Sequence, residues 1–290
     1  MMQHVIPAIV DTRAFRDLQR AHTTAGELVL ADVRWYLDGR DGRASYESGH
    51  LPGAVWVDLD RHLAAHDASA TEGRHPFPTD AAFADAMSSL GIGDNTVVIA
   101  YDDTGGLTAG RLVVMLRMLG HRAAVLDGGM NAWVADGGEL EQGWVAPSTA
   151  DFTPVPWPSD RLASAEDTAS LAAGRPPIGV VLDARSRERF SGEVTQIDPR
   201  PGHVPGAVNA PWSAVLAPDG RLRQPDELRA HFHALGVRDD LPTVTYCGSG
   251  VSACMNVLAM ERAGFAPPSL YVASWSGWSS DPERPAEMGG

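Results

Sequence analysis

The segment Gly49-His50-Leu51-Pro52-Gly53-Ala54-Val55 returns later in the chain as Gly202-His203-Val204-Pro205-Gly206-Ala207-Val208. Shorter segments match around it in the same order. Upstream, Leu30-Ala31-Asp32-Val33-Arg34 pairs with Val181-Leu182-Asp183-Ala184-Arg185, and downstream, Leu90-Gly91-Ile92 pairs with Leu235-Gly236-Val237. A match of this length and order indicates a tandem duplication, so the sequence predicts two copies of one structural unit.

Each half alternates short β-branched runs with helical patterns. In the first half, Thr79 is placed as the N-cap of a helix from Ala81 to Leu90. In the second half, Pro225 lies near the first turn of a helix that runs through Leu235. Such alternation predicts an α/β fold in which each unit is a parallel sheet flanked by helices.

A proline-rich stretch separates the halves. Residues 146–160 hold Pro147, Pro154, Pro156 and Pro158, which suits a stiff linker. We therefore expect domains at residues 1–145 and 161–290.

Composition limits the partners and the compartment. The 290 residues carry 37 acidic and 23 basic side chains, and the net charge of -14 disfavours nucleic acid or an anionic membrane as partner. The two cysteines, Cys247 and Cys254, are poorly placed for a disulfide, which predicts a reduced, cytoplasmic protein. The start at residues 1–7 has no basic stretch, and no run is apolar enough to span a bilayer, so we expect neither a signal peptide nor a membrane span. No ligand cluster suggests a metal, and no cofactor is expected.

The chemistry is expected at Tyr246-Cys247-Gly248-Ser249-Gly250-Val251-Ser252, where an apolar strand runs into a glycine-rich loop and then a helix. Unpaired backbone N–H groups in such a loop favour anions and lower a thiol pKa. A cysteine is more often a small buried apolar residue, but the glycines on both sides of Ser249 favour a functional thiol. Cys254 falls on an apolar helical stripe and is interpreted as core.

The two halves differ in ways that bear on function. Aligning them places Asp102 opposite Cys247, so the second half alone carries the thiol. The first half also has extra residues around 71–76, and such an arm can reach the partner domain. Ligands of open α/β folds bind at the carboxyl ends of the strands, so we expect the site in a cleft facing the first half.

Together these motifs resemble the tandem-domain rhodanese family of sulfurtransferases over nearly the whole chain. The resemblance includes the ending Ser274-Trp275-Ser276-Gly277-Trp278. The cysteine loop is most similar to that of the 3-mercaptopyruvate sulfurtransferase branch, which reads Cys-Gly-Ser/Thr-Gly-Val-Thr, with Ser252 departing from it. Thiosulfate-specific rhodaneses resemble Cys-Arg-Lys-Gly-Val-Thr, and here Gly248 and Ser249 replace those cations.

The resemblance implies roles for particular residues. Cys247 would take up sulfur as a persulfide from a small anionic donor and pass it to a small thiol, a thioredoxin-like protein or cyanide. Arg189 and Arg200 would bind the donor carboxylate. The sulfur would be held by the loop, Gly248, Ser249, Gly250, Val251 and Ser252. A hydrogen-bonded relay would run through Asp60, His75 and Ser249.

Other interpretations remain open. Thiosulfate:cyanide transfer is the nearest alternative, and a non-catalytic rhodanese-like binding module is an alternative of another class, against which the retained Cys247 argues. A cysteine phosphatase would need an arginine six residues after the cysteine, where Ala253 stands. Without the resemblance, Arg189 and Arg200 could be surface cations and His75 a loop histidine. The Asp-x-Arg and Gly-His motifs occur in both halves, so we expect them to be structural.

Overall fold

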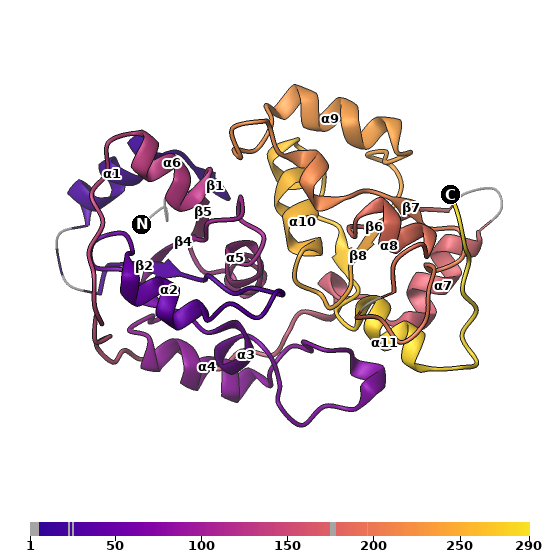
Figure 1. Ribbon diagram of the computed structural model, residues 1–290, viewed down its shortest axis with the longest axis horizontal. Helices are drawn as coiled ribbons and strands as arrows, with labels where there is room; N and C mark the ends of the chain where they lie inside the picture. The colour runs from indigo at the N-terminus through magenta and orange to yellow at the C-terminus, as the bar shows by residue number, and fades with distance from the viewer. Residues whose placement is uncertain (1–5, 23, 25, 175–177, 196) are drawn as a thin grey trace. The chain divides into compact units, whose positions relative to one another are not determined.

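The computed structural model describes residues 6–22, 24, 26–174, 178–195 and 197–290, and the chain forms two compact units (Figure 1). The first unit comprises Met1–Ala64, Pro78–Trp157 and Ala217–Leu222, and the second comprises Ala65–Phe77, Pro158–Leu216 and Arg223–Gly290. Each unit therefore contains a short segment from the other half of the sequence. The expectation of no signal peptide concerned residues 1–7, of which residues 1–5 lie outside the described residues.

The first unit is built on a parallel sheet with strand order β1-β5-β4-β2-β3. Its strands are β1 (Ile9–Val10), β2 (Leu28–Asp32), β3 (Val55–Trp56), β4 (Val97–Tyr101) and β5 (Ala123–Leu126). Its helices are α1 (Thr12–Ala21), α2 (Gly42–Ser48), α3 (Leu59–His62), α4 (Asp80–Ser89), α5 (Ala109–Met118) and α6 (Gly129–Ala135). The predicted cap is confirmed, because the Thr79 hydroxyl accepts a hydrogen bond from Ala82 N at 3.2 Å.

The second unit repeats this plan with a parallel sheet ordered β7-β6-β8-β9. Its strands are β6 (Val180–Asp183), β7 (Val208–Asn209), β8 (Thr243–Tyr246) and β9 (Ser269–Leu270). Its helices are α7 (Ala165–Ala173), α8 (Arg187–Ser191), α9 (Pro225–Ala234), α10 (Ala253–Arg262) and α11 (Ser274–Ser280), with 3-10 turns η1 (Ala70–Glu72), η2 (Ser159–Arg161) and η3 (Trp212–Val215). The predicted α/β class, with a parallel sheet and flanking helices in each unit, is confirmed.

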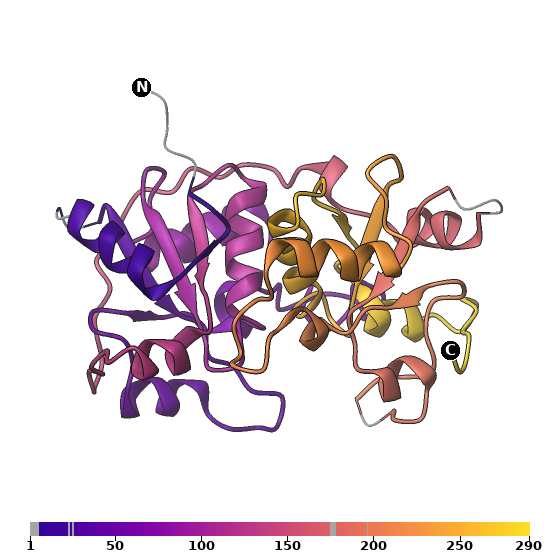
Figure 2. The ribbon, with the colours of Figure 1, turned by 90° about the horizontal axis from the view of Figure 1, so that it is seen from above.

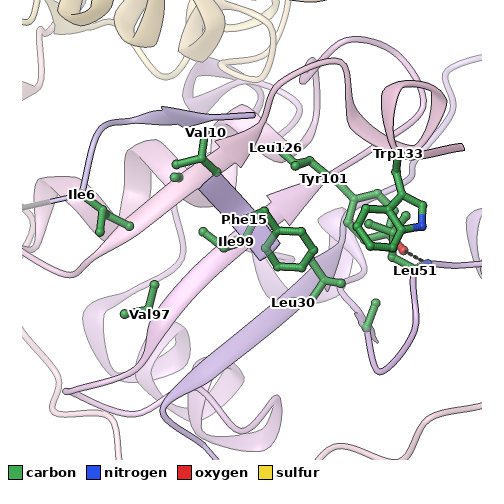
Figure 3. Close-up of a cluster of buried hydrophobic side chains, with 12 residues drawn as sticks. Ile6, Val10, Phe15, Leu30, Leu51, Val97, Ile99, Tyr101, Leu126 and Trp133 are labelled. Atoms are coloured by element: carbon green, nitrogen blue, oxygen red, sulfur yellow. Dashed lines mark hydrogen bonds between the residues drawn. The ribbon is translucent and has the colours of Figure 1, made fainter. Parts of the chain in front are cut away.

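Helices cover both faces of each sheet. In the first unit, Phe15 of α1 and Trp133 of α6 meet edge to face over the strands, and Figure 3 shows them in a buried apolar cluster with Leu30 and Ile99. Figure 2 shows α5 on the other side of these strands. In the second unit, α10 packs on β8 with α9 beside it. These layers shield the strands from water, which accounts for the fully buried side chains of β4 and β8.

The motifs that both halves share form a buried polar frame. Arg34 donates to both carboxylate oxygens of Asp32 and to Gly49 O at 2.7 Å, and Arg185 binds Asp183 and Gly202 O in the same way. Each of these arginines thus ties the end of a central strand to the Gly-His turn. The expected structural role of the Asp-x-Arg motif agrees with this arrangement.

The segments exchanged between the units are held by specific contacts. In the second unit, η1 packs on α11, and Arg74 N donates to Ser276 Oγ at 3.1 Å. Gly73 has a φ of 85°, and a Cβ there would lie 2.3 Å from Ala273 O, so only glycine permits this approach. In the first unit, Leu222 N donates to Asp127 Oδ1 at 2.7 Å. The arm expected around residues 71–76 therefore belongs to the second unit.

Among the described residues, no helix is long and apolar enough to cross a membrane.

His62 should make the stability of the first unit depend on pH. Burial lowers the pKa of His62 to about 4, and its neutral Nδ1 accepts a hydrogen bond from Asp58 N at 3.0 Å. The unfolded chain protonates this histidine near its ordinary pKa of about 6.5. Neutral His62 therefore contributes fully to the unfolding free energy above pH 6.5, and this contribution is lost as the pH falls through about 4. The loss should lower the unfolding free energy by about 1–3 kcal/mol. Urea unfolding at pH 7.5 and 4.5 should show this loss in wild type and a smaller loss in His62→Asn; equal losses would contradict it.

Candidate active site

Cys247 directly follows the central strand β8, at the carboxyl end of the second sheet. Its side chain is only 1% exposed, and α10 begins at Ala253. Gly250 has a φ of 73°, which turns the loop back toward the helix with a backbone conformation that glycine adopts without strain. Neither Cys247 nor Cys254 forms a disulfide, and Cys254 is fully buried on α10 as expected for a core residue.

The start of α11 orients the cysteine loop. Trp275 N donates to Cys247 O at 2.9 Å, and Ser276 N donates to Gly248 O at 3.0 Å. Because the C=O and N–H of a trans peptide point in opposite directions, these bonds turn the N–H groups of Gly248 and Ser249 away from α11. The motif that ends the second half thus aims backbone donors at the thiol.

Ser274 supports the same loop from a strained position. Its Oγ accepts a hydrogen bond from Cys247 N at 3.1 Å and donates to Tyr271 O at 2.9 Å. With a φ of 55°, Ser274 is the one non-glycine residue in the left-handed region among the described residues. Such strain persists only where the surroundings impose it. Ser274 belongs to the ending motif of the second half, but the motif alone does not reveal this role.

The surroundings of Cys247 favour its thiolate. Burial by itself raises the pKa of the Cys247 thiol, but hydrogen bonds from the Ser252 hydroxyl and from the N–H groups of Ser249 and Ala253 outweigh it and bring the pKa below its usual value. Hydrogen bonds to the charged form act in this direction. The sulfur therefore lies among hydrogen-bond donors that stabilise its charged form.

In the first unit, the loop that corresponds to the cysteine loop surrounds a carboxylate. Asp102 follows the central strand β4 at the matching position and is fully buried. Its carboxylate accepts hydrogen bonds of 2.8–3.0 Å from the backbone N–H groups of Thr104, Gly106, Thr108 and Ala109. The loop in the first unit is thus filled by an anion of its own chain. In the second unit, the sulfur of Cys247 occupies the corresponding position and receives hydrogen bonds from its own loop.

The arm brings a histidine to the cysteine loop. His75 Nδ1 lies 2.9 Å from Ser249 Oγ, and each side chain is 8% exposed. Ser249 is two residues from the nucleophile, and its N–H contributes to the low pKa of the thiol. The predicted pairing of His75 and Ser249 is therefore present as a buried contact.

Arg189 lies at the cysteine loop, paired with a carboxylate. Its Nε and Nη2 donate to Asp198 at 3.1 and 2.6 Å. A Cβ added at Gly248 would lie 2.7 Å from Arg189 Nη2 and 3.0 Å from Arg74 Nη2. Arg74 is not among the residues predicted from the sequence, and its place in the inserted arm around residues 71–76 is the signal that could have identified it.

The other two predicted residues have different surroundings. Arg200 donates to the backbone oxygens of Ser279, Asp281 and Arg284 at 2.8–3.0 Å, so its guanidinium braces the end of α11 and the turn after it. Asp60 belongs to the first unit, where its Oδ2 accepts a hydrogen bond from Trp35 Nε1 at 2.8 Å. Their predicted roles in donor binding and in the relay stay predictions.

No group of histidine, cysteine or acidic side chains suited to a metal ion occurs within the described part of the chain.

The sequence matches the family model of the rhodanese-like domain twice, at residues 3–136 and 164–281. It is 41% identical to a Pseudomonas aeruginosa protein named "Probable 3-mercaptopyruvate sulfurtransferase", over 93% of this chain and 95% of that protein. It is 40% identical to a Mycobacterium tuberculosis protein named "Putative thiosulfate sulfurtransferase SseB", over 91% and 93% of the two chains.

The fold is also similar to the crystal structure of SseA from Escherichia coli, presented with the catalytic mechanism of 3-mercaptopyruvate sulfotransferases. The TM-score is 0.80 at 30% identity, and the match covers 93% of this chain and 99% of that one. These similarities extend over both units.

Ser252 should control the ionisation of Cys247. Replacing Ser252 with alanine removes a donor to the thiolate, so the pKa of Cys247 should rise, whereas Ser252→Thr keeps the hydroxyl and should leave it low. The rate of alkylation by iodoacetamide, measured against pH with fragment-ion mass spectrometry to separate Cys247 from Cys254, gives the midpoint. A Ser252→Ala midpoint at or below that of wild type would contradict this assignment.

Proposed function

The chain belongs to the rhodanese family of sulfurtransferases, with two rhodanese-like domains in tandem, and we propose that it transfers sulfur from 3-mercaptopyruvate through a persulfide on Cys247. The observation that carries the proposal is the buried Cys247 thiol, whose pKa is lowered by hydrogen bonds from its own loop. Around it lie a guanidinium from Arg189 and the contact between His75 and Ser249.

In the first half-reaction, the Cys247 thiolate attacks the thiol sulfur of the donor. An S–S bond forms, the C–S bond of the donor breaks, and its electron pair leaves with carbon as the enolate of pyruvate. That carbon then takes one proton to give pyruvate, and the enzyme is left as Cys247–S–SH. This splits the transfer into two steps through a covalent intermediate.

The loop suits the anionic sulfur of the intermediate. The N–H groups of Ser249 and Ala253 already donate to the Cys247 sulfur. The Asp102 loop of the first unit indicates how many backbone donors such a loop can direct at one anion. Preorganised donors of this kind stabilise charge at little cost in reorganisation.

Proton delivery to the enolate carbon is assigned to Ser249 and His75. A hydroxyl in contact with an imidazole can pass a proton near neutral pH, because the ordinary pKa of histidine lies close to it. Asp60 completes the relay in this proposal as the group that orients His75. Arg189 holds the donor carboxylate, assisted by Arg200 and by the loop N–H groups of Gly248, Gly250 and Val251.

In the second half-reaction, an acceptor thiolate or cyanide attacks the outer sulfur of Cys247–S–SH. The S–S bond breaks, its electron pair returns to Cys247 as thiolate, and the acceptor leaves as a persulfide or as thiocyanate. A small thiol or a thioredoxin-like protein would serve in the cytoplasm, which the two free thiols favour as the location.

Thiosulfate is the second candidate donor. One relative at 40% identity carries a thiosulfate sulfurtransferase name, and two guanidinium groups lie beside Gly248 even though the loop itself has no cation. A non-catalytic binding module is disfavoured, because such a module has no need of a thiol with a lowered pKa.

The reduced protein should gain one sulfur atom from 3-mercaptopyruvate. Incubation with the donor should add the mass of one sulfur at Cys247 and release one equivalent of pyruvate, and Cys247→Ser should abolish both, since it removes the nucleophile. Intact-protein mass spectrometry and a pyruvate assay give the two readouts.

Cys254→Ser is the matched control, because that thiol is buried in the core and should not be needed. Full turnover by Cys247→Ser, or no added sulfur in wild type from either donor, would overturn the proposal. Faster loading from thiosulfate than from 3-mercaptopyruvate would overturn the donor assignment alone.

A further inference from the structure

Arg74 reaches the cysteine loop from the arm that the first half contributes to the second unit. Its Nη1 donates to Ile197 O at 2.7 Å and to Asp198 Oδ1 at 3.2 Å. Its backbone N–H donates to Ser276 Oγ, so the arm is held independently of the guanidinium. Among the described residues, Arg74 Nη2 has no hydrogen-bond partner, and it faces the position of a Cβ on Gly248 at 3.0 Å.

Arg189 presents a second open donor at the same place. Its Nε and Nη2 are used by Asp198, but Nη1 has no partner within the described part of the chain. This nitrogen lies 3.3 Å from the position of a Cβ on Gly248. Arg74 and Arg189 therefore share one carboxylate, Asp198, and each keeps a donor nitrogen directed at the residue after the nucleophile.

We propose that Arg74 and Arg189 form a paired-guanidinium subsite for the carboxylate of the sulfur donor, in which Arg74 is the specificity-determining residue. The inference rests on the proposed function and adds to it a residue that neither the loop motif nor the spacing of the arginines identified. Two guanidinium groups that converge on one point grip a planar carboxylate more selectively than one does.

The local charge fits an anionic donor. Asp198 is shared by Arg74, Arg189 and Arg185, and Arg185 also pairs with Asp183. Three guanidinium groups therefore meet two carboxylates at this point, which places net positive charge beside the Cys247 thiol for the carboxylate of a donor such as 3-mercaptopyruvate.

Gly248 is the residue type that this subsite requires. Any side chain there would begin 2.7 Å from Arg189 Nη2 and 3.0 Å from Arg74 Nη2, so it would displace both groups.

Arg74 is accessible to solvent. Together with Gly73, Asp198 and Ser276, Arg74 lines an open hollow of about 450 Å³, and its side chain is 31% exposed. A small anion can reach the guanidinium through this hollow. The Cys247 side chain, by contrast, is almost completely covered.

Steady-state kinetics of Arg74→Ala, Arg74→Lys and Arg189→Ala test the subsite. For 3-mercaptopyruvate, Arg74→Ala should raise KM by about 10-fold to 100-fold with a much smaller change in kcat, because a charge-assisted contact to the donor is lost. Arg74→Lys should bind the donor more tightly than Arg74→Ala but less tightly than wild type, because lysine keeps the positive charge but cannot donate two parallel hydrogen bonds to a carboxylate. With the neutral methyl ester of 3-mercaptopyruvate, wild type and Arg74→Ala should have similar KM values.

Arg238→Ala is the matched control, because Arg238 forms an exposed ion pair with Asp240 and should leave the kinetics unchanged. Thermal unfolding and the rate at which preformed persulfide reacts with cyanide check that each variant is folded and competent in the second half-reaction. Wild-type KM in a folded Arg74→Ala, or an equal rise in KM for the neutral ester, would overturn the inference. Failure of wild type itself to form the persulfide would instead overturn the proposed function.

Discussion

This structure depends on one constraint, which lies in the loop after the central strand of each sheet. There, several backbone N–H groups converge on one acceptor. A strand that ends in the middle of a parallel sheet and turns at once into a helix leaves amide donors without partners, and a buried donor must find an acceptor. In the first unit the acceptor is the Asp102 carboxylate, held at 2.8–3.0 Å. In the second it is the sulfur of Cys247. The duplicated fold thus uses one local geometry for stability in one unit and for chemistry in the other.

The frame around these loops explains why they keep their shape. The buried ion pairs of Arg34 with Asp32 and of Arg185 with Asp183 tie each neighbouring strand to its Gly-His turn. In the second unit, the N-terminus of α11 holds the carbonyl groups of Cys247 and Gly248, and the strained Ser274 completes the support. These contacts hold the loop donors around the Cys247 sulfur in place before any ligand binds, which is the physical meaning of preorganisation.

The segment exchange between the units has a chemical consequence. The arm comes from the first half of the sequence but belongs to the second unit, where it brings Arg74 and His75 to the cysteine loop. The loop after β8 can therefore remain small, with Gly248 and Ser249 beside the thiol, while positive charge and a titratable ring come from another part of the chain.

The sequence by itself determined the duplication, the α/β class, the presence of a thiol in the loop of one half only and the repetition of the buried motifs, because each of these follows from local patterns that repeat or differ between aligned halves. It also indicated His75 and Arg189 through a family resemblance. The tertiary structure alone decided that Arg74 reaches Gly248 and that the guanidinium of Arg200 braces the end of α11. Where a long, charged side chain ends depends on which acceptors folding brings within its reach, and residues 124 apart, such as Arg74 and Asp198, share no local pattern that would reveal their contact.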